Sequence, residues 1–230
     1  MGNPSTNDEE LPSYKQATQG NPGPSQQTDT VTSFHRFIKT VWPGGIQEVR
    51  DYGQAREFKL KGHPWWPARD GPSGPDASRR LIKTLMEALY DMGWVLQSTV
   101  DLRKQPSKDV LVFCRQSPPP PKCEWVCISF DRQDRLIFVE PPAKEIRDAL
   151  HEAFGSAVSS VELTKDHFEI RFHGYAWTPS GEDTVKTPLK LLQLLDTMET
   201  FGFSLYSSVK TMNNDQGADT DEIIMKRQIE

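Results

Sequence analysis

The sequence predicts an α+β protein in which one α-β-α-β-β unit occurs twice, with antiparallel sheets covered by helices. The first observation is self-similarity, because a shift of 112 positions superimposes most of residues 34–115 on residues 146–227. The second is that each copy alternates between helical and strand-like spacing of its apolar residues. The third is size, since 230 residues can form one large or two small domains without disulfide or metal support. An internally duplicated fold satisfies all three.

Composition and self-similarity divide the chain into four segments. Residues 1–31 are rich in Asn, Pro, Ser, Gln and Gly and offer too little apolar surface to fold, so we expect a disordered tail. The first repeat is predicted over residues 32–117 and the second over residues 144–230. Residues 118–143 between them hold a proline-rich spacer and a linking β-hairpin, CEWVCISFDRQDRLIFVE. The sequence leaves open whether one sheet runs through both repeats.

Each repeat is predicted to open with a short amphipathic helix. The apolar residues of this helix recur at i, i+3, i+4, i+7 and i+8, which is the spacing of one helical face. In the first repeat these residues are Phe34, Phe37, Ile38, Val41 and Trp42. Their counterparts in the second repeat are Ile146, Ala149, Leu150, Ala153 and Phe154.

A strand and a Gly-x-x-Trp corner follow in each copy. The segment REFKLKGHPWW superimposes on HFEIRFHGYAW, and each begins with the alternation of a strand. Gly62 and Trp65 of the first repeat therefore meet Gly174 and Trp177 of the second. The corner has two interpretations: a tryptophan closes the end of each core, or Trp65, Trp66 and Trp177 line a binding groove.

A longer helix and a β-hairpin complete each unit. Helical spacing extends over residues 77–92 and 184–201, and Gly93 and Gly202 follow as C-terminal caps. The strand WVLQSTV then parallels FSLYSSV at a shift of 109, and DVLVFCR parallels DEIIMKR at a shift of 112. Each pair of strands predicts a β-hairpin.

Charge differs sharply between the segments. The tail carries a net charge of −3, residues 31–115 carry +5 and residues 116–230 carry −7. Either the oppositely charged repeats dock on each other, or the basic first repeat faces an anionic membrane. The basic residues that would face a membrane are Arg50, Arg56, Lys59, Lys61, Arg79, Arg80 and Lys83.

No motif for catalysis or for cofactor binding is found. The sequence lacks a phosphate-binding loop, a dinucleotide fingerprint, a nucleophile elbow and zinc-ligand spacing. Cys114, Cys123 and Cys127 are predicted to be reduced, small apolar core residues rather than metal ligands. The net charge of −5 argues against a nucleic-acid partner. We therefore expect no cofactor and no metal, and favour a non-enzymatic protein; the alternative is an enzyme or small-ligand binder that uses the cleft between the repeats.

The N-terminus carries a modification signal. MGNPST fits the pattern M-G-x-x-x-[ST] for N-myristoylation of Gly2 after removal of Met1. One myristoyl chain gives only marginal membrane affinity, so a second signal is needed, and the basic first repeat would supply it. The alternative is an unmodified polar tail. Because no apolar segment matches a signal peptide or a transmembrane helix, we expect a cytoplasmic protein that is peripheral on membranes.

The tail also contains a short recognition motif. The segment Leu11-Pro12-Ser13-Tyr14 resembles the L/P-P-x-Y motif that binds WW domains, including those of HECT-type ubiquitin ligases. The resemblance implies that Leu11, Pro12 and Tyr14 contact a WW domain in a polyproline II conformation. Leu11 replaces the commoner first proline, which weakens the match. Together these features predict an adaptor that brings the folded repeats to a membrane and a partner.

Overall fold

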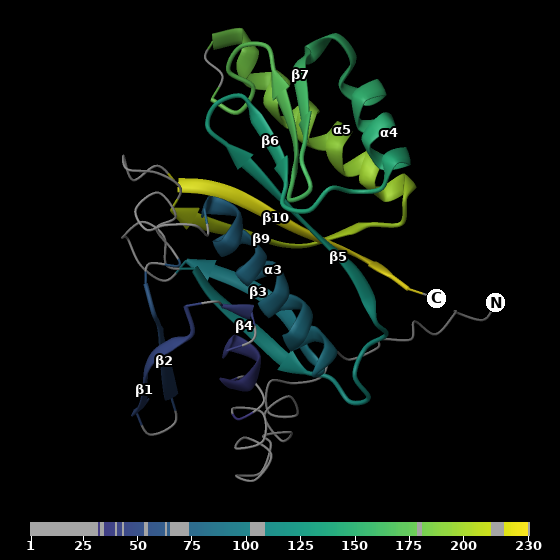
Figure 1. Ribbon diagram of the computed structural model, residues 1–230. Helices are drawn as coiled ribbons and strands as arrows, with labels where there is room; N and C mark the ends of the chain where they lie inside the picture. The colour runs from purple at the N-terminus through teal and green to yellow at the C-terminus, as the bar shows by residue number, and fades with distance from the viewer. Residues whose placement is uncertain are drawn as a thin grey trace, which may run out of the picture.

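Strands and helices follow a duplicated order in the computed structural model of the protein (Figure 1). The structure describes residues 32, 35–39, 41–42, 44–52, 55–62, 64, 74–101, 109–178, 181–212 and 219–229. Residues 35–39 are helical. They are followed by β1 (Ile46–Tyr52), β2 (Ala55–Leu60), α3 (Gly74–Asp91), β3 (Trp94–Asp101) and β4 (Asp109–Arg115). The remaining elements are β5 (Cys123–Asp131), β6 (Arg135–Phe138), α4 (Lys144–Phe154), β7 (Val158–Leu163), β8 (Phe168–Phe172), the 3-10 helix η2 (Gly181–Val185), α5 (Lys186–Thr200), β9 (Ser204–Met212) and β10 (Asp219–Gln228).

The linking hairpin lies at the centre of the largest sheet. This six-stranded sheet has the order β7-β8-β6-β5-β10-β9, and every neighbouring pair is antiparallel. β5 pairs with β10 and β6 pairs with β8, so the hairpin completes the sheet of the second repeat instead of standing between the repeats. β1–β2 and β3–β4 form separate two-stranded sheets. Among the described residues, no sheet therefore runs through both repeats.

The duplication and the antiparallel α+β architecture are confirmed, but each unit contains one strand more than expected. The order is α-β-β-α-β-β, because β1 and β7 precede the strands that the sequence indicated. All residues of β1 and β7 are exposed or only partly buried. A strand with no buried face carries no alternation of apolar and polar residues, so the pattern used to find strands is missing there.

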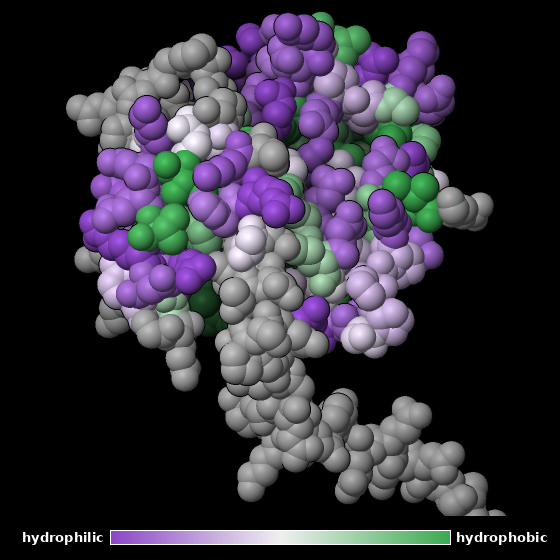
Figure 2. Space-filling view, turned by 60° about the horizontal axis from the view of Figure 1, so that its bottom comes forward, coloured by the Kyte–Doolittle hydropathy of each residue, from purple (hydrophilic) through white to green (hydrophobic). Residues whose placement is uncertain are grey.

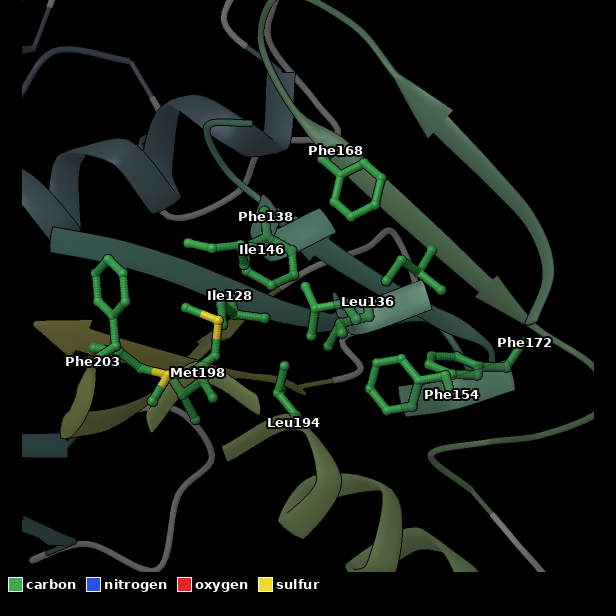
Figure 3. Close-up of a cluster of buried hydrophobic side chains, with 14 of the residues drawn as sticks. Ile128, Leu136, Phe138, Ile146, Phe154, Phe168, Phe172, Leu194, Met198 and Phe203 are labelled. Atoms are coloured by element: carbon green, nitrogen blue, oxygen red, sulfur yellow. The ribbon is translucent and has the colours of Figure 1, made fainter. Parts of the chain in front are cut away.

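One face of the six-stranded sheet forms the larger core with α4 and α5 (Figure 3). Ile128 of β5 and Phe138 of β6 are fully buried beneath Leu150 of α4 and Leu194 of α5. The rings of Phe154 and Phe172 meet edge to face, and Figure 3 shows them next to each other in this core. The apolar face of α4 is therefore buried against the sheet of its own repeat, as its amphipathic spacing predicted.

The opposite face of the same sheet forms a second core with the first repeat. Ile82 and Met86 of α3 pack in one buried cluster with Cys123, Trp125 and Cys127 of β5. Figure 1 shows α3 on one side of the β5–β10 strands and α4 and α5 on the other. β5 is therefore buried on both faces and joins the two repeats.

Two glycines end the long helices in the same way. Gly93 follows α3 with φ 87°, and Gly202 follows α5 with φ 80°. Residues with a side chain rarely adopt this left-handed conformation, which explains why glycine terminates both helices. These glycines also fix the alignment of the two repeats at a shift of 109.

The surface is mixed in character. On the face shown in Figure 2, hydrophilic residues predominate and hydrophobic residues form small separate patches. Within the described part of the chain, none of the helices has the length and apolar character needed to cross a membrane.

Candidate functional site

A buried arginine of α3 is bound by three carboxylates, one on α3 itself and two on strands of the six-stranded sheet. Arg79 is 2% exposed. Its Nε donates to Glu222 Oε1 at 3.1 Å, and its two Nη atoms donate to Asp76 at 3.2 Å and to Asp131 at 3.4 Å. Asp76 also lies 3.4 Å from Nδ1 of His167, on the second repeat. Because a buried charge is costly without its partners, this cluster ties the position of α3 to β5 and β10.

Two further basic residues of α3 extend this contact. Arg80 donates from Nη2 to the backbone oxygen of Val139 at 3.2 Å and to that of Asp166 at 2.7 Å. Lys83 forms an ion pair with Glu140. The polar contact therefore runs along one face of α3 for more than one helical turn.

Three aromatic rings from three elements close the other end of the contact. Tyr90 of α3, Trp125 of β5 and Tyr206 of β9 meet edge to face, with ring centroids 4.9 to 5.7 Å apart. The backbone N–H of Leu96 donates to the Tyr206 hydroxyl at 2.8 Å. Burial raises the pKa of this Tyr206 hydroxyl. The Lys226 ammonium lies 4.7 Å from the centroid of the Tyr90 ring, within cation–π distance.

Sequence reasoning did not find this aromatic cluster. The signal was present in the linking hairpin, where Trp125 and Cys127 alternate with Val126 and Ile128, so apolar residues point to both faces of one strand. Such a strand is buried on both sides. The sequence did not say which element covers the second side, because that contact joins residues far apart in the chain.

The contact changes the interpretation of the basic first repeat. Arg79 and Lys83 are buried and Arg80 is partly buried, all against the second repeat. The prediction that these three residues face a membrane is wrong, because carboxylates and carbonyl oxygens of the acidic repeat bind them. The opposite charges of the two repeats therefore attract each other within the molecule.

The other basic residues predicted to face a membrane lie on or beside the β1–β2 hairpin, and they are exposed: Arg50, Arg56, Lys59 and Lys61. Arg50 pairs with Glu48 at 2.7 Å, and Arg56 pairs with Asp51 at 2.5 Å. The hydrogen bond from Arg50 lowers the pKa of the Glu48 carboxyl. Two of the four cations thus already have carboxylate neighbours, which reduces the positive field of this hairpin.

The tryptophan corner of the second repeat belongs to the core. Trp177 packs edge to face on Phe130 and Phe172, with centroids 4.8 and 5.3 Å away, and its Nε1 donates to the backbone oxygen of Arg135 at 2.7 Å. It closes the end of the larger core and does not line a groove between the repeats. Trp65 and Trp66 lie outside the described residues.

The described surface includes a larger and a smaller concave site. A cavity of about 410 Å³ lies between the opening helix and α3, where Phe37 faces Ala88 and Met92, and where burial raises the pKa of the Glu87 carboxyl. A smaller cavity of about 150 Å³ lies at the start of α5, next to the corner that contains Tyr175. Neither contains a pairing of nucleophile, base and orienting group.

The cysteines differ in burial. Cys123 and Cys127 are buried in the core between the repeats, as predicted, whereas Cys114 on β4 is exposed, which is a correction. Cys114 lies on the β3–β4 hairpin, which pairs with no further strand among the described residues. Burial raises the pKa of the Cys127 thiol, so it is unreactive in the folded protein. Among the described residues, no group of three or more metal-ligating side chains is brought together.

The residues of the predicted tail motifs are not part of the described structure. Gly2, Leu11, Pro12 and Tyr14 all precede residue 32, where the description begins. Myristoylation and WW-domain binding therefore stay predictions.

One domain family matches the chain twice, over residues 25–115 and over residues 124–226. The chain belongs to this family. The description of the family names no activity, so membership establishes the duplication and not a function. The second match begins within β5, in agreement with the hairpin being part of the second sheet.

Other comparisons add little. A comparison with curated proteins finds no match. Among solved structures, a match is found to the crystal structure of a conserved kinetoplastid-specific protein from Trypanosoma cruzi. The match covers 45% of this chain and 94% of that protein's chain, with 16% sequence identity and a TM-score of 0.33. A TM-score of this size supports no argument about fold or function.

Proposed function

We propose that this protein is a non-enzymatic adaptor, in which the docked repeats form one body that an acylated tail attaches to membranes. The docked body is supported by the buried Arg79 cluster and the aromatic contact described above. The proposed location is the cytoplasm, with part of the protein peripheral on membranes. Its tail would bind a WW domain, for example that of a HECT-type ubiquitin ligase.

The observation that carries this proposal is the MGNPST sequence. Gly2 is followed by a small polar segment, and Thr6 occupies the Ser/Thr position that the myristoylation pattern requires. One acyl chain alone gives weak, reversible binding. With Arg79, Arg80 and Lys83 engaged by the second repeat, the predicted membrane-facing cations that stay exposed are those on or beside the β1–β2 hairpin, so we expect attachment that is reversible and sensitive to salt.

Replacing Gly2 with Ala is expected to abolish membrane attachment. The wild-type protein made in eukaryotic cells should lose Met1 and gain about 210 Da, whereas the Gly2→Ala variant should not gain this mass. Intact-mass spectrometry and membrane fractionation at about 0.1 M and about 1 M salt measure both effects. Lys59→Gln combined with Lys61→Gln is the matched control, which should keep the added mass while reducing membrane binding. An unmodified wild-type mass would contradict the proposal.

Replacing Tyr14 with Ala is expected to weaken WW-domain binding about tenfold or more, because the tyrosine ring fills the aromatic groove of such domains. Binding of purified WW domains of a HECT-type ligase to the full chain, followed by fluorescence anisotropy, measures this. Tyr175→Ala is the control, since Tyr175 is 69% exposed on the folded part of the chain. If the Tyr14→Ala variant binds as tightly as the wild-type chain, the Leu11-Pro12-Ser13-Tyr14 segment is not the site that binds WW domains.

A further inference from the structure

The cavity between the opening helix and α3 combines apolar side chains with two carboxylates. Its volume of about 410 Å³ lies within the range of pockets that bind small ligands, about 300–1,000 Å³. One lining residue comes from the opening helix, and the others come from the second half of α3 and the residue that follows it. The lining residues are Phe37, Thr84, Glu87, Ala88, Asp91 and Met92.

The two carboxylates of the cavity have no cation bound to them. Glu87 and Asp91 are one turn apart, so they lie on the same face of α3. Among the described side chains, neither forms an ion pair or a hydrogen bond, and the nearby Lys83 pairs with Glu140 instead. Burial raises the pKa of the Glu87 carboxyl, and the charge of Asp91 raises it further. An occupant that brings a cation would relieve both effects.

The equivalent helix of the second repeat is covered more completely. α4 corresponds to the opening helix and α5 to α3, and α4 and α5 pack against each other. At the shift of 109, Leu85 and Leu89 of α3 correspond to Leu194 and Met198, which are both 0% exposed. Leu85 and Leu89 are only partly buried. The described part of the first repeat therefore leaves apolar side chains of α3 incompletely covered.

Residues 11–17 of the same chain, with the sequence LPSYKQA, carry side chains that suit this cavity. Leu11 and Tyr14 are the only large apolar residues among residues 2–30. Lys15 is the only Lys or Arg in the same range. The apolar side chains can bury surface in the cavity, and the Lys15 ammonium can pair with its carboxylates.

The described structure begins close to the cavity in sequence. Thr32 precedes Phe37, which lines the cavity, by five residues. Tyr14 lies 18 residues before Thr32, and a flexible chain of that length spans about 23 Å on average. Such a tether gives an effective concentration in the millimolar range, so a dissociation constant of about 0.1 mM between separate molecules would suffice for docking within one chain.

We propose that the LPSYKQA segment of the tail docks in the cavity between the opening helix and α3 of its own chain. Leu11 and Tyr14 contact the apolar side chains of the cavity. The Lys15 ammonium pairs with the carboxylates of Glu87 and Asp91.

Two other occupants fit the cavity less well. An acyl chain on Gly2 carries no charge, so it would bury the Glu87 carboxylate further without a partner. The tail of a second copy has the right side chains, but it lacks the tether that raises the local concentration. The segment of the same chain meets both requirements.

Docking hides the motif that was assigned above to WW-domain binding. This consequence rests on the proposed function, because Leu11 and Tyr14 take part in both contacts. A WW domain then competes with the cavity, and its apparent affinity is reduced by the fraction of chains whose tail is docked. The cavity thereby regulates access to the tail.

Nitrogen-15 relaxation of the full-length, unacylated chain tests the docking without a WW domain or a membrane. In the wild type, the backbone order parameters of Tyr14 and Lys15 should exceed about 0.6, below which a backbone is flexible. Lys15→Glu should lower them below about 0.6, and so should Glu87→Lys combined with Asp91→Lys. A chain with all three substitutions again has opposite charges in contact, so its order parameters should return toward those of the wild type.

A matched control makes the same change of charge on the equivalent helix. Asp196→Lys combined with Glu199→Lys alters two exposed positions of α5, and should leave the order parameters of the tail unchanged. At the shift of 109, Asp196 is the counterpart of Glu87. Circular dichroism confirms the fold of each variant. Lys15→Glu changes the tail alone, so it tests the docking even if the α3 substitutions prevent folding.

Three results would overturn the proposal. Wild-type order parameters below about 0.6 at Tyr14 would show that the segment does not dock. High values that neither Lys15→Glu nor the α3 substitutions lower would show that the segment binds elsewhere. High values that fall on about tenfold dilution would assign the contact to the tail of a second copy.

Binding of a WW domain, followed by fluorescence anisotropy, tests the consequence for the motif. The Glu87→Lys, Asp91→Lys chain should bind about fivefold more tightly than the wild type, because its tail is undocked. Equal affinity would show that docking does not hide the motif. A WW domain that binds neither chain would contradict the proposed function, whereas the order parameters would still decide the docking.

Discussion

Replacing Arg79 with Ala should lower the free energy of unfolding by about 3–5 kcal/mol. The substitution removes the cation that Glu222, Asp131 and Asp76 surround, and Glu222 then stays as a buried carboxylate without this partner. The cost comes from burying the Glu222 carboxylate without this cation more than from the lost attraction. Urea unfolding followed by circular dichroism measures the change.

A second substitution separates the two causes. Adding Glu222→Gln to Arg79→Ala should recover part of the loss, because the amide is neutral and costs less to bury than a carboxylate. Arg50→Ala is the control, since the ion pair of Arg50 with Glu48 is exposed and is worth about 1 kcal/mol or less. An Arg79→Ala variant as stable as Arg50→Ala would show that the buried cluster does not hold the repeats together.

Replacing Phe138 with Ala should also cost about 3–5 kcal/mol, for a different reason. Phe138 is fully buried at the centre of the larger core, against Phe168, and its removal leaves a cavity that the strands of the sheet cannot fill. Urea unfolding measures this loss as well. Val161→Ala on β7 is the control, because Val161 is 50% exposed and its loss should change stability by about 0.5 kcal/mol or less.

The Phe138 substitution also reports on cooperativity. β5 contributes Ile128 to the larger core and Trp125 to the core between the repeats, so the two cores share a strand. Tryptophan fluorescence and circular dichroism should therefore show one common unfolding transition. Two separate transitions in the Phe138→Ala variant would show that the repeats unfold independently in spite of the shared strand.

The elements with one buried face were predictable from the sequence. The spacing of Ile146, Leu150 and Phe154 predicts α4 because a helix that buries one face must repeat its apolar residues at that interval. Gly93 and Gly202 mark the helix ends because the chain adopts a left-handed conformation there, which glycine adopts more readily than other residues. β1 and β7 were missed because strands that bury little have no such pattern.

The sequence by itself determined the duplication, the helices, the hairpins β3–β4, β5–β6 and β9–β10, and the opposite net charges of the two repeats. Only the tertiary structure decided that the linking hairpin is the centre of the second sheet, and that Arg79 meets Glu222 across 143 positions of the chain. Local spacing reports which face of an element is buried, since neighbouring residues share that face. It does not report what covers the face, because the covering residues are distant in sequence and are selected by packing and charge in three dimensions.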